Sequence, residues 1–140
     1  MATLTKWAVR RAGHGDRDAV LRLWRSAGLT GADENEWQAL THGAAARLLV
    51  GQENDRLVGT VVVAFDGWRA YIYHVAVDPS VRGRGLGRAL LAEAEADLRS
   101  QGARRAYVEV SEANTAGLAL CTSSGFEPEG EIALVKELHG

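Results

Sequence analysis

The sequence predicts an α/β fold with one mixed, mostly antiparallel sheet of about six to seven strands and helices on both faces. Residues 47–77 form successive apolar runs separated by short polar turns, which is typical of antiparallel strands. Residues 71–110 have the pattern strand, helix, strand, which requires a right-handed crossover and parallel pairing of the two strands. With 140 residues the chain is long enough for one core, so we expect residues 1–140 to be a single domain.

Strand and helix patterns follow one another in a defined order along the chain. Apolar residues at every second position favour strands, and apolar residues three to four apart favour helices. Glycines close several of the predicted helices, because glycine tolerates the backbone conformation beyond a helix end. The expected strands span residues 6–12, 47–50, 57–65, 68–77 and 106–110, with a final pair made by Phe126 and residues 131–138. The expected helices run from Asp16 to Gly28, within residues 29–43, from Leu86 to Gly102 and from Asn114 to Ser123.

The most informative stretch lies between a predicted strand, stopped by Asp78-Pro79, and a predicted helix. Glycine lets the backbone approach a ligand closely, and the free N–H groups and dipole of a first helical turn favour an anion there. Arginine side chains add charge-assisted hydrogen bonds to such a group. The stretch combines both residue types in the order Arg82, Gly83, Arg84, Gly85, Leu86, Gly87 and Arg88. This pattern indicates a phosphate-binding loop.

Two better-known phosphate loops do not fit the spacing. A Walker loop requires a lysine, and the chain has none between Lys6 and Lys136. A dinucleotide fingerprint, Gly-x-Gly-x-x-Gly, would place its third glycine at Arg88 or Leu90. A simple helix-entry turn needs fewer glycines and arginines than residues 82–88 contain. Binding of a nucleotide phosphate by the same loop stays open at this point.

The loop resembles the acetyl-CoA pyrophosphate loop of the GCN5-related N-acetyltransferases, the GNAT family. Its pattern Arg82-x-x-Gly85-x-Gly87 follows Val-Asp-Pro and precedes a helix. A second family motif lies downstream, with Asn114, a residue seven positions later, and Gly125-Phe126 four positions beyond that. The spacing is kept, but Cys121 stands where the family usually has a tyrosine. The order of the elements matches the family over nearly the whole chain.

The resemblance implies an enzyme that moves an acetyl group from acetyl-CoA directly to a primary amine. The pyrophosphate would lie on residues 82–88, and the pantetheine arm would pair with the strand edge Val75-Ala76-Val77 and meet Asn114. A backbone N–H of that strand would stabilise the oxyanion, an effect of roughly 3–4 kcal/mol per donor in other acyl transfers. Asn114 is also a predicted helix cap. The alternative is a regulatory module that binds acyl-CoA without catalysis, which the missing tyrosine suggests.

Deprotonation of the amine requires a base, because an aliphatic ammonium group costs about 4–5 kcal/mol to deprotonate at pH 7. Glu109 is the first candidate, His74 beside the donor strand is the second, and Glu112 is the third. Each also has a structural interpretation, as a solvated carboxylate or a core histidine. Cys121 occupies the position of the acid, but a thiol has a shorter reach than a tyrosine hydroxyl. We expect Cys121 to be a small apolar filler, with water or Tyr107 supplying the proton or with no dedicated acid at all.

The first two helices, their loop and residues 68–77 are expected to shape the acceptor pocket, as in the family. Acidic side chains could attract a cationic amine there, and aromatic ones could form a wall by cation–π contact. A solvated acidic loop over core tryptophans explains the same residues. The residues concerned are Asp33, Glu34 and Glu36, and Trp24, Trp37 and Trp68. The sequence leaves the acceptor open between a small molecule and a peptide or protein amine.

Composition limits the partners and the compartment. The net charge of −2 provides no basic surface for nucleic acid. The longest apolar run, residues 61–65, is too short to span a bilayer, so we expect no membrane insertion. Cys121 is the single cysteine, which favours a reducing compartment and a cytoplasmic protein. We expect no metal site, and a homodimer stays open.

Overall fold

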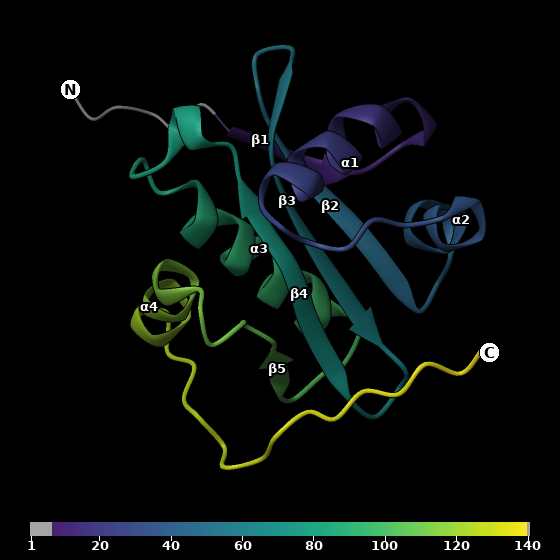
Figure 1. Ribbon diagram of the computed structural model, residues 1–140. Coiled ribbons are helices and arrows are strands. Elements are labelled where there is room, and N and C mark those ends of the chain that lie inside the picture. The colour runs from purple at the N-terminus through teal and green to yellow at the C-terminus, as the bar shows by residue number, and fades with distance from the viewer. Residues whose placement is uncertain (1–6, 140) are drawn as a thin grey trace.

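The computed structural model describes residues 7–139 and contains one five-stranded sheet with the order β1-β2-β3-β4-β5 (Figure 1). Neighbouring strands from β1 to β4 are antiparallel, and β5 lies parallel to β4. This confirms the predicted mixed, mostly antiparallel sheet. Lys6, which the predicted first strand included, lies outside the described residues. The strands are β1 (Trp7–Arg11), β2 (Ala46–Glu53), β3 (Arg56–Phe65), β4 (Ala70–Val77) and β5 (Ala106–Val108).

Helices cover both faces of the sheet, as the sequence predicts. The first two helices pack on one face around buried Trp24 and Trp37, and the third packs on the other face through Leu86 and Leu90. Burial of these apolar stripes is the main stabilising contribution to such a layered fold. None of the helices within residues 7–139 has the length and apolar character needed to cross a membrane. The helices are α1 (Arg17–Ser26), α2 (Glu34–His42), α3 (Leu86–Ser100) and α4 (Thr115–Ser123), with short 3₁₀ turns at His14–Asp16 and Pro79–Val81.

Helix α3 lies very close to the sheet because two glycines face it. Gly51 of β2 and Gly59 of β3 are directly paired across the sheet. A Cβ atom at Gly59 would come within 2.9 Å of methyl groups of both Leu86 and Leu90. At Gly51 a Cβ would come within 3.1 Å of Leu86. The glycine pair therefore lets the first two turns of α3 pack directly against the sheet backbone, and this packing sets the position of the helix N-terminus.

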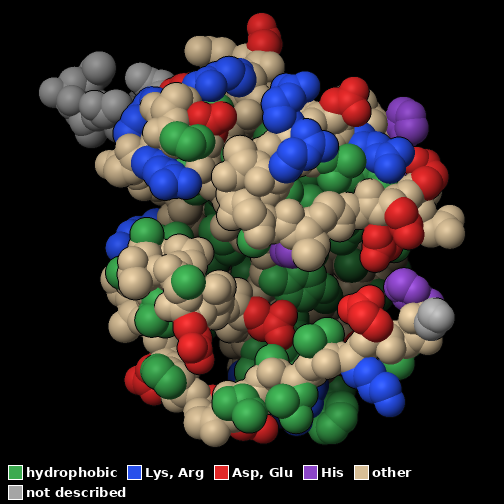
Figure 2. Space-filling model, viewed as in Figure 1, with side chains coloured by type: hydrophobic (Ala, Val, Ile, Leu, Met, Phe, Trp, Pro, Cys, Tyr) green, Lys and Arg blue, Asp and Glu red, His purple; other side chains and the backbone are tan. Residues whose placement is uncertain are grey.

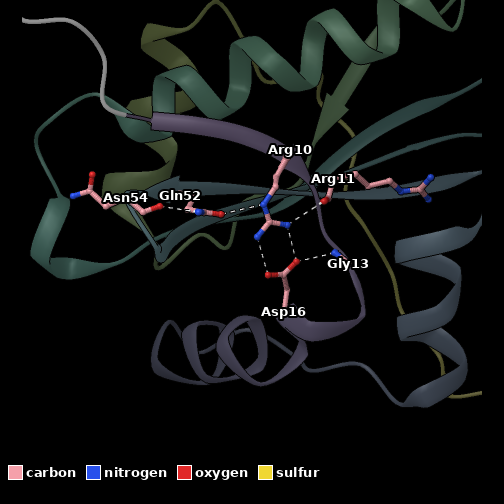
Figure 3. Close-up of polar contacts among 6 residues, drawn as sticks. All are labelled: Arg10, Arg11, Gly13, Asp16, Gln52 and Asn54. Carbon is pink, nitrogen blue, oxygen red and sulfur yellow. Dashed lines mark hydrogen bonds and ion pairs between the residues drawn. The ribbon is translucent and has the colours of Figure 1, made fainter.

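A polar network connects the start of the chain to the β2–β3 hairpin (Figure 3). Arg10 of β1 makes two hydrogen bonds of 2.7 and 2.9 Å to the carboxylate of Asp16, which precedes α1. The same carboxylate accepts a 2.7 Å bond from the backbone N–H of Gly13. Arg10 Nε also donates to Gln52, whose amide donates to the carbonyl of Asn54. The hydrogen bonds from Arg10 hold the pKa of Asp16 below its ordinary value.

The C-terminal strand pair predicted from Phe126 and residues 131–138 is wrong. The described part of the chain has no strand after β5, so the sheet has five strands rather than six or seven. Pro128 lacks a backbone donor and Gly130 has φ 82°, which interrupts the extended chain before the segment. No sheet edge pairs with residues 131–138, and Ile132, like the other large apolar residues there, is more than four-fifths exposed. Alternating apolar residues form a strand only where a neighbouring strand satisfies the backbone.

Candidate active site

The glycine loop has the backbone conformation that its sequence requires. Gly83 and Gly85 have φ angles of 77° and 89°, in the left-handed region that favours glycine. Asp78 stabilises the turn before the loop by accepting hydrogen bonds from the N–H and the hydroxyl of Ser80, at 2.9 and 2.7 Å. Gly85 is the N-cap of α3, so the N–H groups of the first helical turn lack helical partners. They form a site suited to a phosphate group.

The three arginines of the loop have different surroundings. Arg84 makes a 2.6 Å ion pair with Glu53 and lies over the ring of Trp7, which commits it to the β1–β2 edge. Arg88 donates to the hydroxyl of Ser123 on α4 at 3.1 Å. Arg82 is exposed and has no side-chain hydrogen bond or ion pair within residues 7–139. The sequence gave no reason to distinguish the three arginines, whereas the structure leaves the side chain of Arg82 most available to bind an anion.

Strands β4 and β5 separate in the middle of the sheet. They pair only over residues 70–72 and 106–108, and the N–H of Glu109 makes the last contact, 3.4 Å from the carbonyl of Ile72. Beyond this point β4 continues to Val77, and its edge on the β5 side has no strand partner in the described structure. Val75, Ala76 and Val77 lie along this edge. An extended ligand arm could therefore pair with it as an added strand.

Asn114 and Cys121 lie on the helix beside this opening. Asn114 is the N-cap of α4, and its side-chain oxygen accepts a 2.9 Å hydrogen bond from the N–H of Gly117. Its amide group stays exposed. Cys121 is only 4% exposed and belongs to the core under α3, and burial raises the pKa of its thiol. This placement supports the interpretation of Cys121 as an apolar filler.

Glu109 and Tyr73 lie at the fork between the two strands. Glu109 is exposed, directly after β5. Tyr73 is partly buried on β4, and burial followed by the charge of Glu109 raises the pKa of its phenol. Tyr107, the proton donor that the sequence suggested, is instead held by Arg69 at 3.1 Å and is stacked on Tyr71. The sequence did not single out Tyr73 as an acid, because its proximity to Glu109 depends on where β4 and β5 part.

A pocket of about 280 Å³ opens between β4 and the loop that joins α1 to α2. Tyr73 and His74 line it from the strand, while Trp24, Thr30 and Glu36 line it from the helices and loop. Figure 2 shows a hollow with a hydrophobic floor near the centre of this face and acidic side chains below it. The pocket lies beside the fork, on the same side of the sheet as α1 and α2.

Only part of the predicted acceptor wall reaches this pocket. Trp24 and Glu36 line it. Trp37 is fully buried in the core, and Trp68 is 81% exposed in the β3–β4 hairpin. Glu34 is paired with Arg17 at 2.5 Å. Asp33 and Glu36 form the capping box of α2, in which the side chain of each accepts a hydrogen bond from the backbone N–H of the other.

The site combines a glycine loop suited to a phosphate group, a free edge of β4 suited to an extended ligand, and a pocket on the α1 and α2 side of the sheet. A model of the GNAT acetyltransferase family matches residues 16–126, so the chain belongs to this family. It is therefore an acyltransferase that uses acetyl-CoA as the acyl donor. The loop conformation, the free edge of β4 and the exposed amide of Asn114 fit such a donor.

Solved structures share the fold at low sequence identity. A transcriptional regulator from Bacillus halodurans C-125 is 17% identical, with a TM-score of 0.81 over 94% of this chain and 99% of that one. An aminoglycoside acetyltransferase from an uncultured soil metagenomic sample, in complex with sisomicin, is 18% identical, with a TM-score of 0.79 over 96% and 97%. An acetyltransferase from Clostridium acetobutylicum, named as predicted and solved with acetyl-CoA, is 13% identical, with a TM-score of 0.74 over 95% and 99%.

Proposed function

We propose that the protein is an N-acetyltransferase that moves the acetyl group of acetyl-CoA directly to a primary amine bound in the pocket beside β4. The observation that carries this proposal is the fork after Ile72, because the next two residues of β4, Tyr73 and His74, line the pocket. A thioester on the edge and an amine in the pocket would meet there. Two groups near the fork support this arrangement, namely the phenol of Tyr73 and the carboxylate of Glu109, whose charge acts on that phenol.

In this mechanism Glu109 accepts a proton from the bound ammonium group, directly or through water. The neutral amine attacks the thioester carbonyl, and a backbone N–H of residues 75–77 stabilises the oxyanion. Collapse of the tetrahedral intermediate expels the CoA thiolate, which takes up a proton from Tyr73 or water. The nitrogen loses its remaining extra proton to the deprotonated donor, which forms the neutral amide and restores the donor. The phenol of Tyr73 is protonated at neutral pH, because the pKa of a tyrosine is ordinarily about 10 and burial raises it further here. The raised pKa also makes the phenol a weaker acid, which is why water is the alternative donor. Cys121 is left out of the proton transfer because its thiol is buried.

The acceptor class follows from the lining of the pocket. Glu36 Oε1 accepts the N–H of Asp33 in the capping box, which leaves its second oxygen to face a ligand. Trp24 and Tyr73 add aromatic walls, and a cationic amine gains from both kinds of group. Polyamines, peptide amino termini and aminoglycosides all carry such a cationic amine. Sisomicin belongs in the screen because a protein of the same fold is known in complex with it.

The test is release of free CoA thiol from acetyl-CoA in the presence of a broad panel of amines. A single acceptor with turnover well above the hydrolysis blank supports the proposal. Binding of acetyl-CoA by calorimetry without turnover of any amine would favour the non-catalytic acyl-CoA module instead. Competition by ATP as strong as that by CoA would favour a nucleotide-phosphate site in the same loop.

The proposal also covers the organisation of the protein. We take residues 1–140 to be one N-acetyltransferase domain that works in the cytoplasm, in keeping with its single cysteine, Cys121. A homodimer is compatible with this function, and light scattering of the purified protein decides the oligomeric state.

A further inference from the structure

His74 has a backbone conformation that is rare for its residue type. Its φ angle is 53°, and Asn54, in a tight turn, is the other non-glycine residue with positive φ in the described structure. The pairing of β4 with β3 changes register at this point, because Thr60 pairs with Ala76 while Val62 pairs with Tyr73. Two steps along β3 match three along β4, so His74 lies in a β-bulge. Left-handed backbone at a histidine persists only where its surroundings hold it.

The carbonyl group of the bulge is held from inside the core. Thr60, which is fully buried, donates its hydroxyl hydrogen to the carbonyl of His74 at 3.0 Å. The same hydroxyl accepts a 2.8 Å hydrogen bond from the indole N–H of buried Trp24. This chain of two bonds satisfies every polar group involved. It connects α1, β3 and the bulge in β4.

The side chain of His74 contacts a different part of the molecule from its carbonyl group, namely the loop between α1 and α2. Its Nε2 atom lies 3.0 Å from the carbonyl of Thr30 and 3.2 Å from the hydroxyl of that residue. A carbonyl oxygen only accepts, so Nε2 carries the hydrogen and donates it to Thr30. The ring also packs edge-on against Trp24, with centroids 4.7 Å apart. With Nε2 serving as a donor, this nitrogen is not available to take a proton from an amine.

The bond to Thr30 anchors the rim of the acceptor pocket. Leu29, just before it, bonds to the carbonyl of Trp24, and Asp33, just after it, caps α2. Within residues 7–139, no other hydrogen bond ties residues 30–32 to the rest of the chain. Thr30, Gly31 and Ala32 all line the pocket. Ala32 also packs against the core under α1 and α2, but the hydrogen bonding that holds this rim to β4 comes from one side chain.

We propose that His74 is a positioning residue that fixes the rim of the acceptor pocket against the donor strand, so that a bound amine is held at the fork. The inference rests on the proposed function for its kinetic consequence. His74 belongs to the strand whose edge faces the donor, and Thr30 belongs to the loop that faces the acceptor. Their bond sets the distance between the two substrates. The donor loop at residues 82–88 does not depend on it.

His74→Asn is the direct test, because asparagine tolerates the left-handed backbone but is too short to reach Thr30. Hydrogen exchange of the two hydrogen-bonded amides that flank the rim, those of Leu29 and Asp33, should become about tenfold faster in the free protein. The KM of the acceptor should rise about five- to twentyfold, with kcat within about threefold, because the lost contact acts on acceptor placement. The Kd of acetyl-CoA, by calorimetry, should change less than about twofold. His14→Asn, the same change at an exposed turn, is the matched control.

Two further variants separate the side chain from the backbone. His74→Gly removes the ring and relieves the backbone, so it should reproduce the exchange and KM effects even if His74→Asn folds poorly. Thr30→Val keeps the carbonyl acceptor and should have a smaller effect than either. Unchanged exchange at Leu29 and Asp33 overturns the inference, as does a collapse of kcat at constant KM, which would identify His74 as the base. If no amine is turned over, the proposed function fails, while the exchange measurement still decides the role of His74.

Discussion

Gly59→Ala tests how closely α3 is seated on the sheet, and with it the position of the anion site. The added Cβ would lie 2.9 Å from methyl carbons of both Leu86 and Leu90 and 3.2 Å from the carbonyl oxygen of Ala76. Leu86 and Leu90 are at most 1% exposed, so neither can swing into solvent. The two leucine side chains must shift, and because they are enclosed we expect α3 to move away from β3 with them. The helix N-terminus would move with it.

The magnitude follows from two opposing contributions. Overpacking of a well-packed core costs about 1–3 kcal/mol. Replacing glycine by alanine returns about 0.4–1 kcal/mol by restricting the unfolded chain. The expected net loss is about 1–2 kcal/mol of unfolding free energy, or about 3–8 °C in Tm for a chain of this size. Gly51→Ala, with a nearest contact of 3.1 Å to one leucine methyl, should cost less and is the matched control.

Urea unfolding followed by circular dichroism measures the stability change, and calorimetry with acetyl-CoA measures the effect on the donor site. We expect Gly59→Ala to lower stability more than Gly51→Ala and to weaken acetyl-CoA binding. Wild-type stability for Gly59→Ala would refute the argument that the glycine pair sets the position of α3.

Three shorter predictions concern the donor loop, the core thiol and the N-terminal network. Gly85→Ala should weaken acetyl-CoA binding in calorimetry, because a φ angle of 89° strains any residue with a side chain. Gly85→Glu should abolish binding, because it also adds a negative charge that repels the phosphates. Equal effects of the two variants would contradict an anion site. Cys121→Ala should lower kcat/KM less than about tenfold, since the thiol is buried and outside the proton path, and a larger loss in a folded variant would make it the acid. Asp16→Asn should lower the unfolding free energy at pH 7 by about 1 kcal/mol, because half-exposed Arg10 is partly screened. The pKa of Asp16 is lowered in the folded state, so its contribution is present above the unfolded pKa and is lost as pH falls through the folded one. The gap between wild type and variant should therefore close in acid, and a gap that persists at pH 2 would contradict the ion pair.

The sequence predicts those parts of the fold that depend on local patterns. The apolar stripe of α3 and the Asp66-Gly67 hairpin both follow from residue spacing, and both are confirmed. The backbone conformation of the glycine loop also follows from the sequence, because the positive φ angles at Gly83 and Gly85 are available to few other residues. Its role as an anion site stays a prediction. The C-terminal strands fail because pairing depends on a distant edge that the local pattern does not contain.

The candidate site could be predicted only in part for the same reason. Sequence spacing and the family resemblance predicted the donor loop, Asn114 and Glu109 as site residues, and these roles stay predictions. Sequence spacing could not reveal that Arg84 pairs with Glu53 or that His74 is hydrogen-bonded to Thr30, since each contact joins residues more than thirty positions apart. It also missed the association of Tyr73 with Glu109, which exists because β4 and β5 part after three pairs.

Glu109→Gln tests the central claim most directly, namely that an amine from the pocket attacks the thioester at the fork between β4 and β5. With an acceptor from the amine panel, kcat/KM should fall by roughly 10²–10⁴ while acetyl-CoA affinity stays nearly unchanged, because the amide keeps the shape but cannot take a proton. The pH profile should also lose an ionisation. Glu112→Gln changes the third candidate base, an exposed carboxylate three residues further on, and should be close to wild type if Glu109 is the base. A Glu109→Gln enzyme with wild-type kcat/KM and an unchanged pH profile would contradict the account.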